Sequence, residues 1–455
     1  MTTARADKPG SERGSVLNAF ANPFVKLVER WMPDAFIFAI LLTVLTFILA
    51  ITLAGQSPQA AIEGWGDGVW KLLTFTAQIS MTLVTGYALA NTPLLQRGIN
   101  AAAGSIHSAG AAYTLVTFVA AAASLVSWGM GLIVGAVVAR EVANVCRKRN
   151  VKVHYPLLVA SGYAGFVLWH QGLSSSVALK LAEEGHFLSK ITGTIPLSET
   201  LLSSTNIIIV VAVFLTLPFV MRLMRPADKD CVEFDPGHVE PHEGEHHSDP
   251  TPAERISESR WLNWIVGLAG VFYLVNKVMN GGTIDLNFVN FGFLIAGILL
   301  TSSPIHYVRL ITEGGRTLGP IILQYPFYAG IMGIMMSSGL AQIMSEGLAV
   351  AATADTLPFW AMISGGVVNM FVPSGGGQWA VQGPVMMEAA TQLGADQAKV
   401  ALGVAIGDQW TNMLQPFWTI PALAIAGLKV RDVMGYCVIA FIWTGIIFSI
   451  GLLWF

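Results

Sequence analysis

The stretch FVPSGGGQWAVQGPVMMEAA, residues 371–390, places a proline, a serine and three consecutive glycines inside a long uncharged segment. Residues 356–387 contain no Asp, Glu, Lys or Arg, and a helix needs about 20 such residues to cross the hydrocarbon core of a bilayer. Glycine and proline are the poorest helix formers, so the helix should break here. Such a break at membrane depth is tolerated only where protein or a water-filled cavity covers it. The stretch therefore predicts a re-entrant helical hairpin over residues 356–391.

The composition predicts an all-α polytopic membrane protein. Hydrophobic residues make up 54% of the chain and charged residues 12%, about half of the roughly 25% that is typical of a soluble domain. Further charge-free runs cover residues 98–139, 317–345 and 433–455, and each is long enough for a membrane helix. Basic residues are not interleaved with aromatic ones, so we expect no nucleic-acid partner. The three cysteines form no C-x-x-C pair, so neither a disulfide framework nor a metal site is expected.

A second hairpin is predicted at S-W-G-M-G, residues 127–131. The positive-inside rule places Arg97 and the basic cluster that begins at Arg147 on the cytoplasmic side. The mostly apolar residues 109–144 between them must then enter the membrane and return to the same side. Two half-length helices joined at residues 127–131 satisfy this constraint, and two full spans would need a longer segment.

The two hairpins belong to a sequence that repeats. Ser127 and Glu141 recur as Ser374 and Glu388, in each case 247 positions later, and the same offset within one residue links two pairs of glycines and one pair of glutamines. Each identity is weak by itself, and the constant spacing is the signal. We therefore expect two structural repeats, each with a re-entrant hairpin.

The repeats and the basic residues together predict the domain organisation and the orientation. An extra helix near residues 261–279 reverses the phase of the second repeat, so the two repeats have inverted topology, as in many secondary transporters. The N-terminus is expected in the cytoplasm and the C-terminus outside. The predicted parts are a cytoplasmic N-terminal segment (1–34), a first membrane repeat (35–222), a cytoplasmic polar linker (223–260), and an extra helix with the second membrane repeat (261–455).

Two further interruptions occur inside predicted spans, at WHQGLSSS (169–176) and at GDQWTNMLQPFW (407–418). Both place polar residues and a Gly or Pro where a plain membrane helix would have Leu or Ile, so they predict one broken transmembrane helix per repeat. Four breaks should line one central site, because inverted repeats bring both hairpin tips to the midplane. The expected substrate-binding residues are Ser127, Trp128, Gly129, Gly131, Gln171, Ser374, Gly375, Gly376, Gly377, Gln378 and Trp379.

The charge of this predicted site indicates a small monocarboxylate. The breaks contain no Lys or Arg, but each helix N-terminus with free N–H groups stabilises a bound anion by roughly 0.3–2 kcal/mol. Burying one carboxylate costs about 2.5–3.5 kcal/mol, which two such termini and a few donors can offset. Without a phosphate-binding loop for ATP, the coupling ion is H⁺ or Na⁺, and no other cofactor is expected. The candidate coupling-ion residues are His170, Ser174, Asp408, Gln409, Asn412 and Gln415.

Three motifs at the predicted helix breaks resemble those of the bacterial short-chain fatty acid transporter family. The resemblance rests on V-P-S-G-G-G-Q-W-A-V-Q-G-P (372–384), G-D-Q-W-T-N-M-L-Q-P-F-W (407–418) and S-W-G-M-G-L-I-V-G-A (127–136). It implies secondary active uptake of butyrate, acetoacetate and similar acids across the inner membrane. It further implies an elevator-type, ion-coupled carrier that is often dimeric, with substrate bound at the hairpin tips, residues 127–131 and 374–379.

Other interpretations of the same residues stay open at this stage. The triple glycine could serve close helix packing rather than a site. For His170, a hydrogen-bonded interior histidine is favoured over a proton relay, and Asp408 is as well explained as a structural partner of the helix break. The alternative function is an intramembrane serine-type hydrolase or acyl-transfer enzyme, with Ser374 as nucleophile and His170 as base.

Overall fold

The computed structural model describes residues 23–27, 30, 33, 35–94, 97–98, 101, 106, 108–126, 128–186, 188–235, 251–282, 286–316, 318–349, 352–373 and 375–455. In these ranges the chain is helical, without a β-strand, which confirms the all-α prediction. Ser127 and Ser374, the two serines predicted at the hairpin tips, lie outside the described residues.

Five helices within the described ranges are long and apolar enough to cross a membrane. Several shorter apolar helices, between 10 and 17 residues long, accompany them. The chain is therefore a polytopic helical membrane protein. The five candidate spans are α6 (Ala109–Val126), α7 (Trp128–Lys148), α11 (Ser204–Leu223), α13 (Arg260–Met279) in a longer helical stretch that begins with α12 (Pro252–Ser257), and α22 (Val430–Trp454).

The arms of the first hairpin are longer than predicted. Helices α6 and α7 contain 18 and 21 residues, which correspond to about 27 and 32 Å at 1.5 Å per residue. The prediction of two half-length helices is therefore wrong for this hairpin, because α6 fills its Ala-rich run completely and α7 continues to Lys148. In the second hairpin α18 (Leu357–Asn369) has 13 residues and α19 (Gly375–Leu393) has 19.

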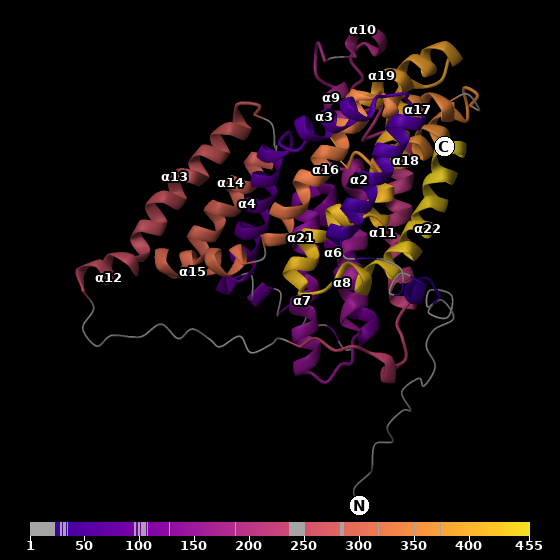
Figure 1. The fold of residues 1–455 in the computed structure, drawn as a ribbon. Coiled ribbons are helices and arrows are strands. Elements are labelled where there is room, and N and C mark those ends of the chain that lie inside the picture. The colour runs from indigo at the N-terminus through magenta and orange to yellow at the C-terminus, as the bar shows by residue number, and fades with distance from the viewer. Residues whose placement is uncertain are drawn as a thin grey trace, which may run out of the picture.

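The order of helices repeats along the chain. Helices α2 and α3 pack against α16, and reciprocally α14 and α15 pack against α4. Helices α3 and α15, which hold equivalent places in the order, lie near opposite ends of the molecule (Figure 1). The first series is α2 (Ala35–Thr52), α3 (Pro58–Gly68), α4 (Leu73–Ala90), α6, α7, α8 (Tyr155–Gly165) with the 3₁₀ helix η1 (Phe166–Gln171), and α11; the second is α14 (Leu286–Leu300), α15 (Pro304–Gly315), α16 (Gly319–Ser337), α18, α19, α20 (Gln397–Thr411) with η3 (Asn412–Leu414), and α22.

The remaining elements lie between or beside these series. Helix α13 stands at the edge of the molecule, next to α14, with most of its surface exposed (Figure 1). The end of α11, where the predicted linker begins, and α12, near the end of that linker, lie at the same end of the helices (Figure 1). The short elements are α9 (Ala178–Leu181), α10 (Ser189–Thr192), η2 (Asp228–Asp230), α17 (Leu340–Ala349) and α21 (Pro416–Ala426).

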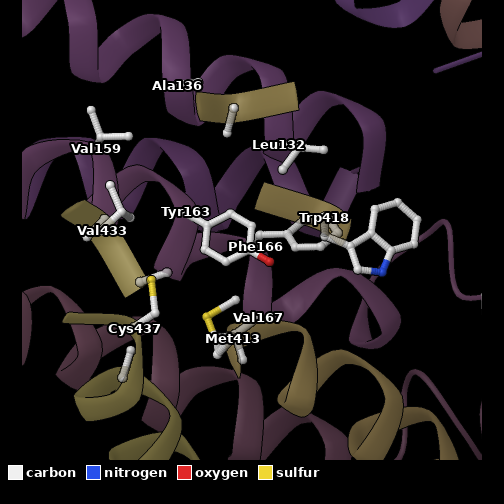
Figure 2. Packing of buried hydrophobic residues seen from close by; sticks show 14 of the residues in the cluster. Leu132, Ala136, Val159, Tyr163, Phe166, Val167, Met413, Trp418, Val433 and Cys437 are labelled. Carbon is white, nitrogen blue, oxygen red and sulfur yellow. The ribbon is translucent and has the colours of Figure 1, made fainter. Parts of the chain in front are cut away.

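The main hydrophobic core joins segments from both halves of the chain. Tyr163 of α8, Phe166 of η1, Met413 of η3, Trp418 of α21 and Cys437 of α22 lie together in it (Figure 2). The broken parts of both interrupted helices are thus embedded in packed apolar side chains. This burial holds their irregular backbone in place beside the site described next.

Candidate functional site

The first predicted break is present at the end of α8. The α-helix stops at Gly165, a 3₁₀ turn carries Trp169, His170 and Gln171, and Gly172 continues in an extended conformation. All three of those side chains are buried. Gly172 passes so close to the backbone carbonyl of Leu125, at the end of α6, that a Cβ would collide with it. The break therefore lies directly against the first hairpin.

The second predicted break is present between α20 and α21. Helix α20 ends at Thr411, η3 follows, and Gln415 adopts an extended conformation with φ −117° and ψ 147°. An extended residue is expected here because Pro416 follows, and proline disfavours the helical conformation of the residue before it. Asp408 and Gln409 occupy the last turn of α20, and both are buried.

Hydrogen bonds join the two breaks. The Gln409 side chain accepts from the backbone N–H of His170 at 2.8 Å and donates to Gln171 Oε1 at 2.9 Å. The Tyr163 hydroxyl donates to the backbone carbonyl of Asn412 at 2.7 Å. Gln409 is therefore a bridge between the breaks that uses both ends of its amide, and its predicted role as a coupling-ion ligand stays a prediction.

His170 and Asp408 face each other at the centre of this junction. His170 Nε2 lies 3.5 Å from Asp408 Oδ2, and the two side chains are 0% and 2% exposed. Among the described residues, neither carboxylate oxygen of Asp408 nor His170 Nε2 has a hydrogen-bond partner. A buried charge without partners is costly, so this pair is a candidate place for a proton, an ion or a ligand.

Both hairpin tips reach the same junction. The backbone N–H of Trp128 donates to Ser174 Oγ at 2.8 Å, so Ser174 holds the first tip. At the second tip, a Cβ on Gly375 would lie 2.5 Å from Ser176 Oγ and 2.6 Å from His170 Nε2. The structure therefore brings all four predicted breaks together around His170.

Tryptophan rings line one flank of the junction. The rings of Trp128 and Trp418 are 5.2 Å apart, and those of Trp169 and Trp418 are 6.2 Å apart. The Trp169 ring lies against the His170 ring at 3.6 Å between centroids. The four breaks thus combine an apolar aromatic wall with a polar centre, which suits a small molecule with one charged end.

Several predicted substrate-binding residues have other contacts. Gly131 lies so close to Ser124 of α6 that it serves helix packing, as Gly135 does where α7 meets α8. Gln378 donates to the carbonyl of Gly365 and to Gln382 Oε1, so it links α19 to α18. The structure thus gives Gly131 and Gln378 structural contacts, and their predicted role in binding stays a prediction.

The remaining tip residues differ in their surroundings. Trp379 is 1% exposed and packs with Val177 and Leu181 in a second apolar cluster, apart from the tryptophan wall. Gly129 is buried and Gly377 half-buried. Gly376 is exposed, and a Cβ there would meet no atom within 4 Å. Gly376 therefore borders open space at the start of α19.

Asn369 is a central polar residue that sequence reasoning missed. Its Nδ2 lies 2.8 Å from the Asp408 carbonyl, 2.9 Å from Thr411 Oγ1 and 2.8 Å from Asn412 Oδ1. Gln415 Nε2 also reaches Asn412 Oδ1, at 3.0 Å. The signal was a single Asn at the end of an apolar run, five positions before Ser374 and outside the glycine motif.

Among the described residues, the buried polar atoms without partners at the junction are of two kinds. The donors include Trp169 Nε1, Gln171 Nε2 and Asn412 Nδ2, together with the hydroxyl of Ser176, which can also accept. The acceptors include Asn369 Oδ1 and Gln415 Oε1, together with the Asp408 carboxylate. The first kind matches an anion and the second a cation.

Large cavities lie elsewhere. One of about 820 Å³ is lined by Glu199, Asp355, Asp396 and Lys399 near the C-terminal end of α22. Another, of about 620 Å³, is lined by apolar side chains of α4, α6 and α7, with Phe293 of α14. Neither cavity includes His170 or Asp408, so the candidate site rests on the convergence of the breaks.

Broken helices that meet at a buried polar centre inside a polytopic helical fold are characteristic of secondary transporters. The chain belongs to the short-chain fatty acid transporter family, whose model matches residues 16–455. A protein of Escherichia coli (strain K12) is 43% identical over 431 residues, covering 94% of this chain and 97% of the relative. One of Haemophilus influenzae (strain ATCC 51907 / DSM 11121 / KW20 / Rd) is 40% identical over 436 residues, covering 93% and 97%. The names of both relatives assign them provisionally to short-chain fatty acid transport.

Similar solved structures are more distant. The YdaH transporter of Alcanivorax borkumensis is 14% identical with a TM-score of 0.44, covering 92% of this chain and 97% of that chain. MtrF of Neisseria gonorrhoeae is 16% identical with a TM-score of 0.37, covering 95% and 97%. The assignment therefore rests on the sequence relatives. Because the family consists of transporters, the chain is a transporter and not an enzyme, and the hydrolase alternative is removed.

Proposed function

We propose that this chain is a secondary active transporter that takes up short-chain monocarboxylates, such as butyrate and acetoacetate, across the inner membrane. The observation that carries the proposal is the convergence of four helix breaks on the buried His170–Asp408 pair. Buried donors and acceptors that have no partner in the described part of the chain lie on the same and adjoining segments. A site of this kind offers an anion and a cation adjacent places, as coupled transport requires.

The proposed membrane path is that of two inverted repeats with re-entrant hairpins and elevator-type motion. The repeated order of helices and the reciprocal packing of α2 and α3 on α16 and of α14 and α15 on α4 support it. The opposite placement of α3 and α15 supports the inversion (Figure 1). With the basic linker in the cytoplasm, the N-terminus is cytoplasmic and the C-terminus periplasmic. A homodimer is proposed as the working unit, on the family resemblance.

The substrate carboxylate is proposed to bind at the N-terminus of α19, beside Gly375 and Gly376. The first N–H groups of a helix have no partner within it and attract anions. Trp169 Nε1 and Gln171 Nε2 supply side-chain donors nearby. The short apolar tail then lies against the wall formed by Trp128 and Trp418.

The coupling ion is proposed to be H⁺ or Na⁺, held at Asp408. A proton would be shared with His170, 3.5 Å away. A sodium ion would use the acceptors of Asp408 together with Asn369 Oδ1 and Gln415 Oε1, which have no partner among the described residues. Either cation offsets the negative charge that the substrate carboxylate adds beside Asp408.

The proposal is tested by uptake of labelled butyrate into proteoliposomes, with the rate into protein-free liposomes subtracted. We expect saturable uptake that unlabelled acetate and acetoacetate compete for. Gly376→Leu should abolish it, because the leucine fills the open space at the α19 terminus, whereas Gly376→Ala should retain it. Uptake that never saturates in the wild type, or that is equal in Gly376→Leu, would overturn the proposal.

A further inference from the structure

The chain that follows α11 turns back across the start of α8. We call residues 231–235 the strap. The backbone N–H of Tyr155, the first residue of α8, donates to the Val232 carbonyl at 2.8 Å. The Phe234 ring lies against the Tyr155 ring, with 4.9 Å between the two centroids. The strap is therefore bound to the end of α8 that is remote from the candidate site.

His154 holds the strap through one of its ring nitrogens. The backbone N–H of Val232 donates to His154 Nδ1 at 3.0 Å, and His154 is 8% exposed. A backbone N–H can only donate, so Nδ1 accepts and carries no proton. The proton of the neutral ring is then on Nε2, which donates to the Tyr436 hydroxyl of α22 at 3.0 Å. The bond to the strap exists only while Nδ1 is free of a proton.

His154 and Tyr155 also join the outer ends of both broken helices. The His154 N–H donates to the Tyr113 hydroxyl of α6 at 2.8 Å. The Tyr155 hydroxyl donates to the carbonyl of Ala426, the last residue of α21, at 2.8 Å. Helix α8 leads into the first break, which begins at Phe166, about 17 Å along the helix, and α21 follows the second break. A change at His154 can therefore reach the site through two helices.

We propose that His154 is a pH-dependent latch, which holds the strap across α8 while its ring is neutral and releases it when the ring is protonated. The ring takes one proton from solution onto Nδ1. Two donors, Nδ1–H and the Val232 N–H, then face each other, so the hydrogen bond to the strap is lost. The start of α8 is then held by fewer bonds, and transport slows. This inference goes beyond the proposed function; in the orientation given there, the latch responds to the pH of the cytoplasm.

The direction of the pH dependence follows from the burial of the ring. Burial lowers the pKa of His154 from 6.5 to about 4 while the strap is bound. A released ring that water can reach has an ordinary pKa of about 6.5. The released state therefore binds more protons between these two values, and release becomes easier as the pH falls through them. Above about pH 6.5 the latch is fully stable.

Neighbouring charges do not keep a proton on the ring. The lowered pKa of His154 has burial as its cause, without a contribution from a nearby carboxylate. Arg225, just before the strap, is paired with Asp228. The titratable and charged groups on the surrounding elements are Tyr113 on α6, Arg140 and Glu141 on α7, Lys152 before α8, Tyr155 on α8, Arg222 on α11, Asp432 and Tyr436 on α22, Arg225, and Cys231 and Glu233 in the strap.

The test measures hydrogen exchange of the Val232 amide in the purified full-length protein between about pH 4.5 and 7. Each rate is divided by the rate of the same amide in the unfolded chain at that pH, which removes the intrinsic pH dependence of exchange. Exchange reports local opening, and the amide of Ala136, buried within α7, shows whether the whole protein unfolds instead. The variants are His154→Asn, His154→Phe and, as a matched control, His306→Asn, a half-buried histidine at the start of α15.

We expect the protection of the wild-type Val232 amide to fall roughly 50-fold from pH 7 to 4.5, while Ala136 stays protected. His306→Asn should behave as the wild type. Asparagine carries its amide oxygen on Cγ, as histidine carries Nδ1, so His154→Asn can accept from Val232 without titrating, and protection should not change with pH. His154→Phe has no acceptor and should leave the Val232 amide poorly protected even at pH 7.

The effect on transport is measured at pH 7 as counterflow, in which liposomes loaded with unlabelled butyrate take up labelled butyrate. Counterflow should be slower in His154→Phe than in His154→Asn, and equal rates would show that the strap does not act on transport. A wild-type Val232 protection that is independent of pH, or a wild-type pH dependence in His154→Asn, would overturn the latch, even if His154→Phe does not fold. Wild-type protein without any counterflow would instead refute the proposed function, and the exchange rates would still decide the latch.

Discussion

Adding a methyl group at Gly375 should damage the site, whereas the same change at the next residue should not. A Cβ on Gly375 would lie 2.5 Å from Ser176 Oγ, 2.6 Å from His170 Nε2 and 2.8 Å from Trp169 Cη2. These distances fall well short of an ordinary carbon contact of about 3.5–4.0 Å. Either η1 or the start of α19 must therefore move by about 1 Å. At Gly376 a Cβ meets no atom within 4 Å.

The size of the effect follows from these contacts. Overpacking a well-packed interior costs about 1–3 kcal/mol. The better helix propensity of alanine returns at most about 1 kcal/mol, and it does so equally at both positions. The free-energy cost of Gly375→Ala, in folding or in substrate binding, should therefore exceed that of Gly376→Ala by about 1–3 kcal/mol. If the strain falls on substrate binding, this difference corresponds to roughly a 5- to 150-fold rise in half-saturation.

The assay compares the two variants in thermal unfolding of the purified protein and in saturable uptake of labelled butyrate. Gly376→Ala should match the wild type in both, and Gly375→Ala should be impaired in at least one of them. Indistinguishable behaviour of the two variants in both measurements would show that α19 does not pack against His170 as described.

Two other predictions concern buried hydrogen bonds. Burial lowers the pKa of His154 from its ordinary 6.5 to about 4, and its Nδ1 accepts from the Val232 N–H at 3.0 Å. The unfolded chain therefore binds more protons between these values, so unfolding should become easier by up to about 3 kcal/mol as the pH falls from 6.5 to 4. Gln409→Leu leaves the His170 N–H and Gln171 Oε1 unpaired, and it should cost about 1–3 kcal/mol per group in thermal stability and abolish uptake.

Each of these predictions has a control. His154→Gln should unfold with a flatter dependence on pH than the wild type; equal slopes in the variant and the wild type would exclude His154 as the cause. Gln392 is exposed and bonds to Glu388 on the same helix, so Gln392→Ala should leave stability and uptake unchanged. A Gln409→Leu protein as stable as Gln392→Ala would contradict the bridge between the breaks.

The positions of the helix breaks could be predicted because their causes are local. Gly172 and Pro416 each disfavour continuation of the preceding helix through their own backbone. At the second hairpin the break precedes the glycines, because Gly375, Gly376 and Gly377 form the first turn of α19. Helix length could not be predicted in the same way. Apart from the segment near 127, the sequence 109–148 contains only isolated glycines, Gly110 and Gly135, which the helices accommodate, so α6 and α7 extend to 18 and 21 residues. The prediction from the number of residues between Arg97 and the cluster at Arg147 underestimated the lengths of these two helices.

The roles of residues within a break could be predicted less well. Gln378 and Trp379 follow Gly375 by three and four positions, and each residue turns the helix by about 100°. A motif read along the chain places them together with the glycines, but the packing of α19 directs Gln378 to α18 and Trp379 to the cluster with Val177. Which face of α19 meets η1 is decided by contacts between distant segments.

The pairing of His170 with Asp408 illustrates why a site of this kind depends on both repeats. His170 Nε2 and the Asp408 carboxylate have no hydrogen-bond partner among the described residues, and these two groups, 3.5 Å apart, come from different halves of the chain. A buried ionisable group without a partner is costly, so each residue makes the other necessary. The histidine was expected to be a hydrogen-bonded interior residue, and its Nδ1 does lie 3.2 Å from Ser175 Oγ, whereas its Nε2 has no such bond among the described residues. An unfilled bonding position beside a helix N-terminus is what a transported carboxylate requires.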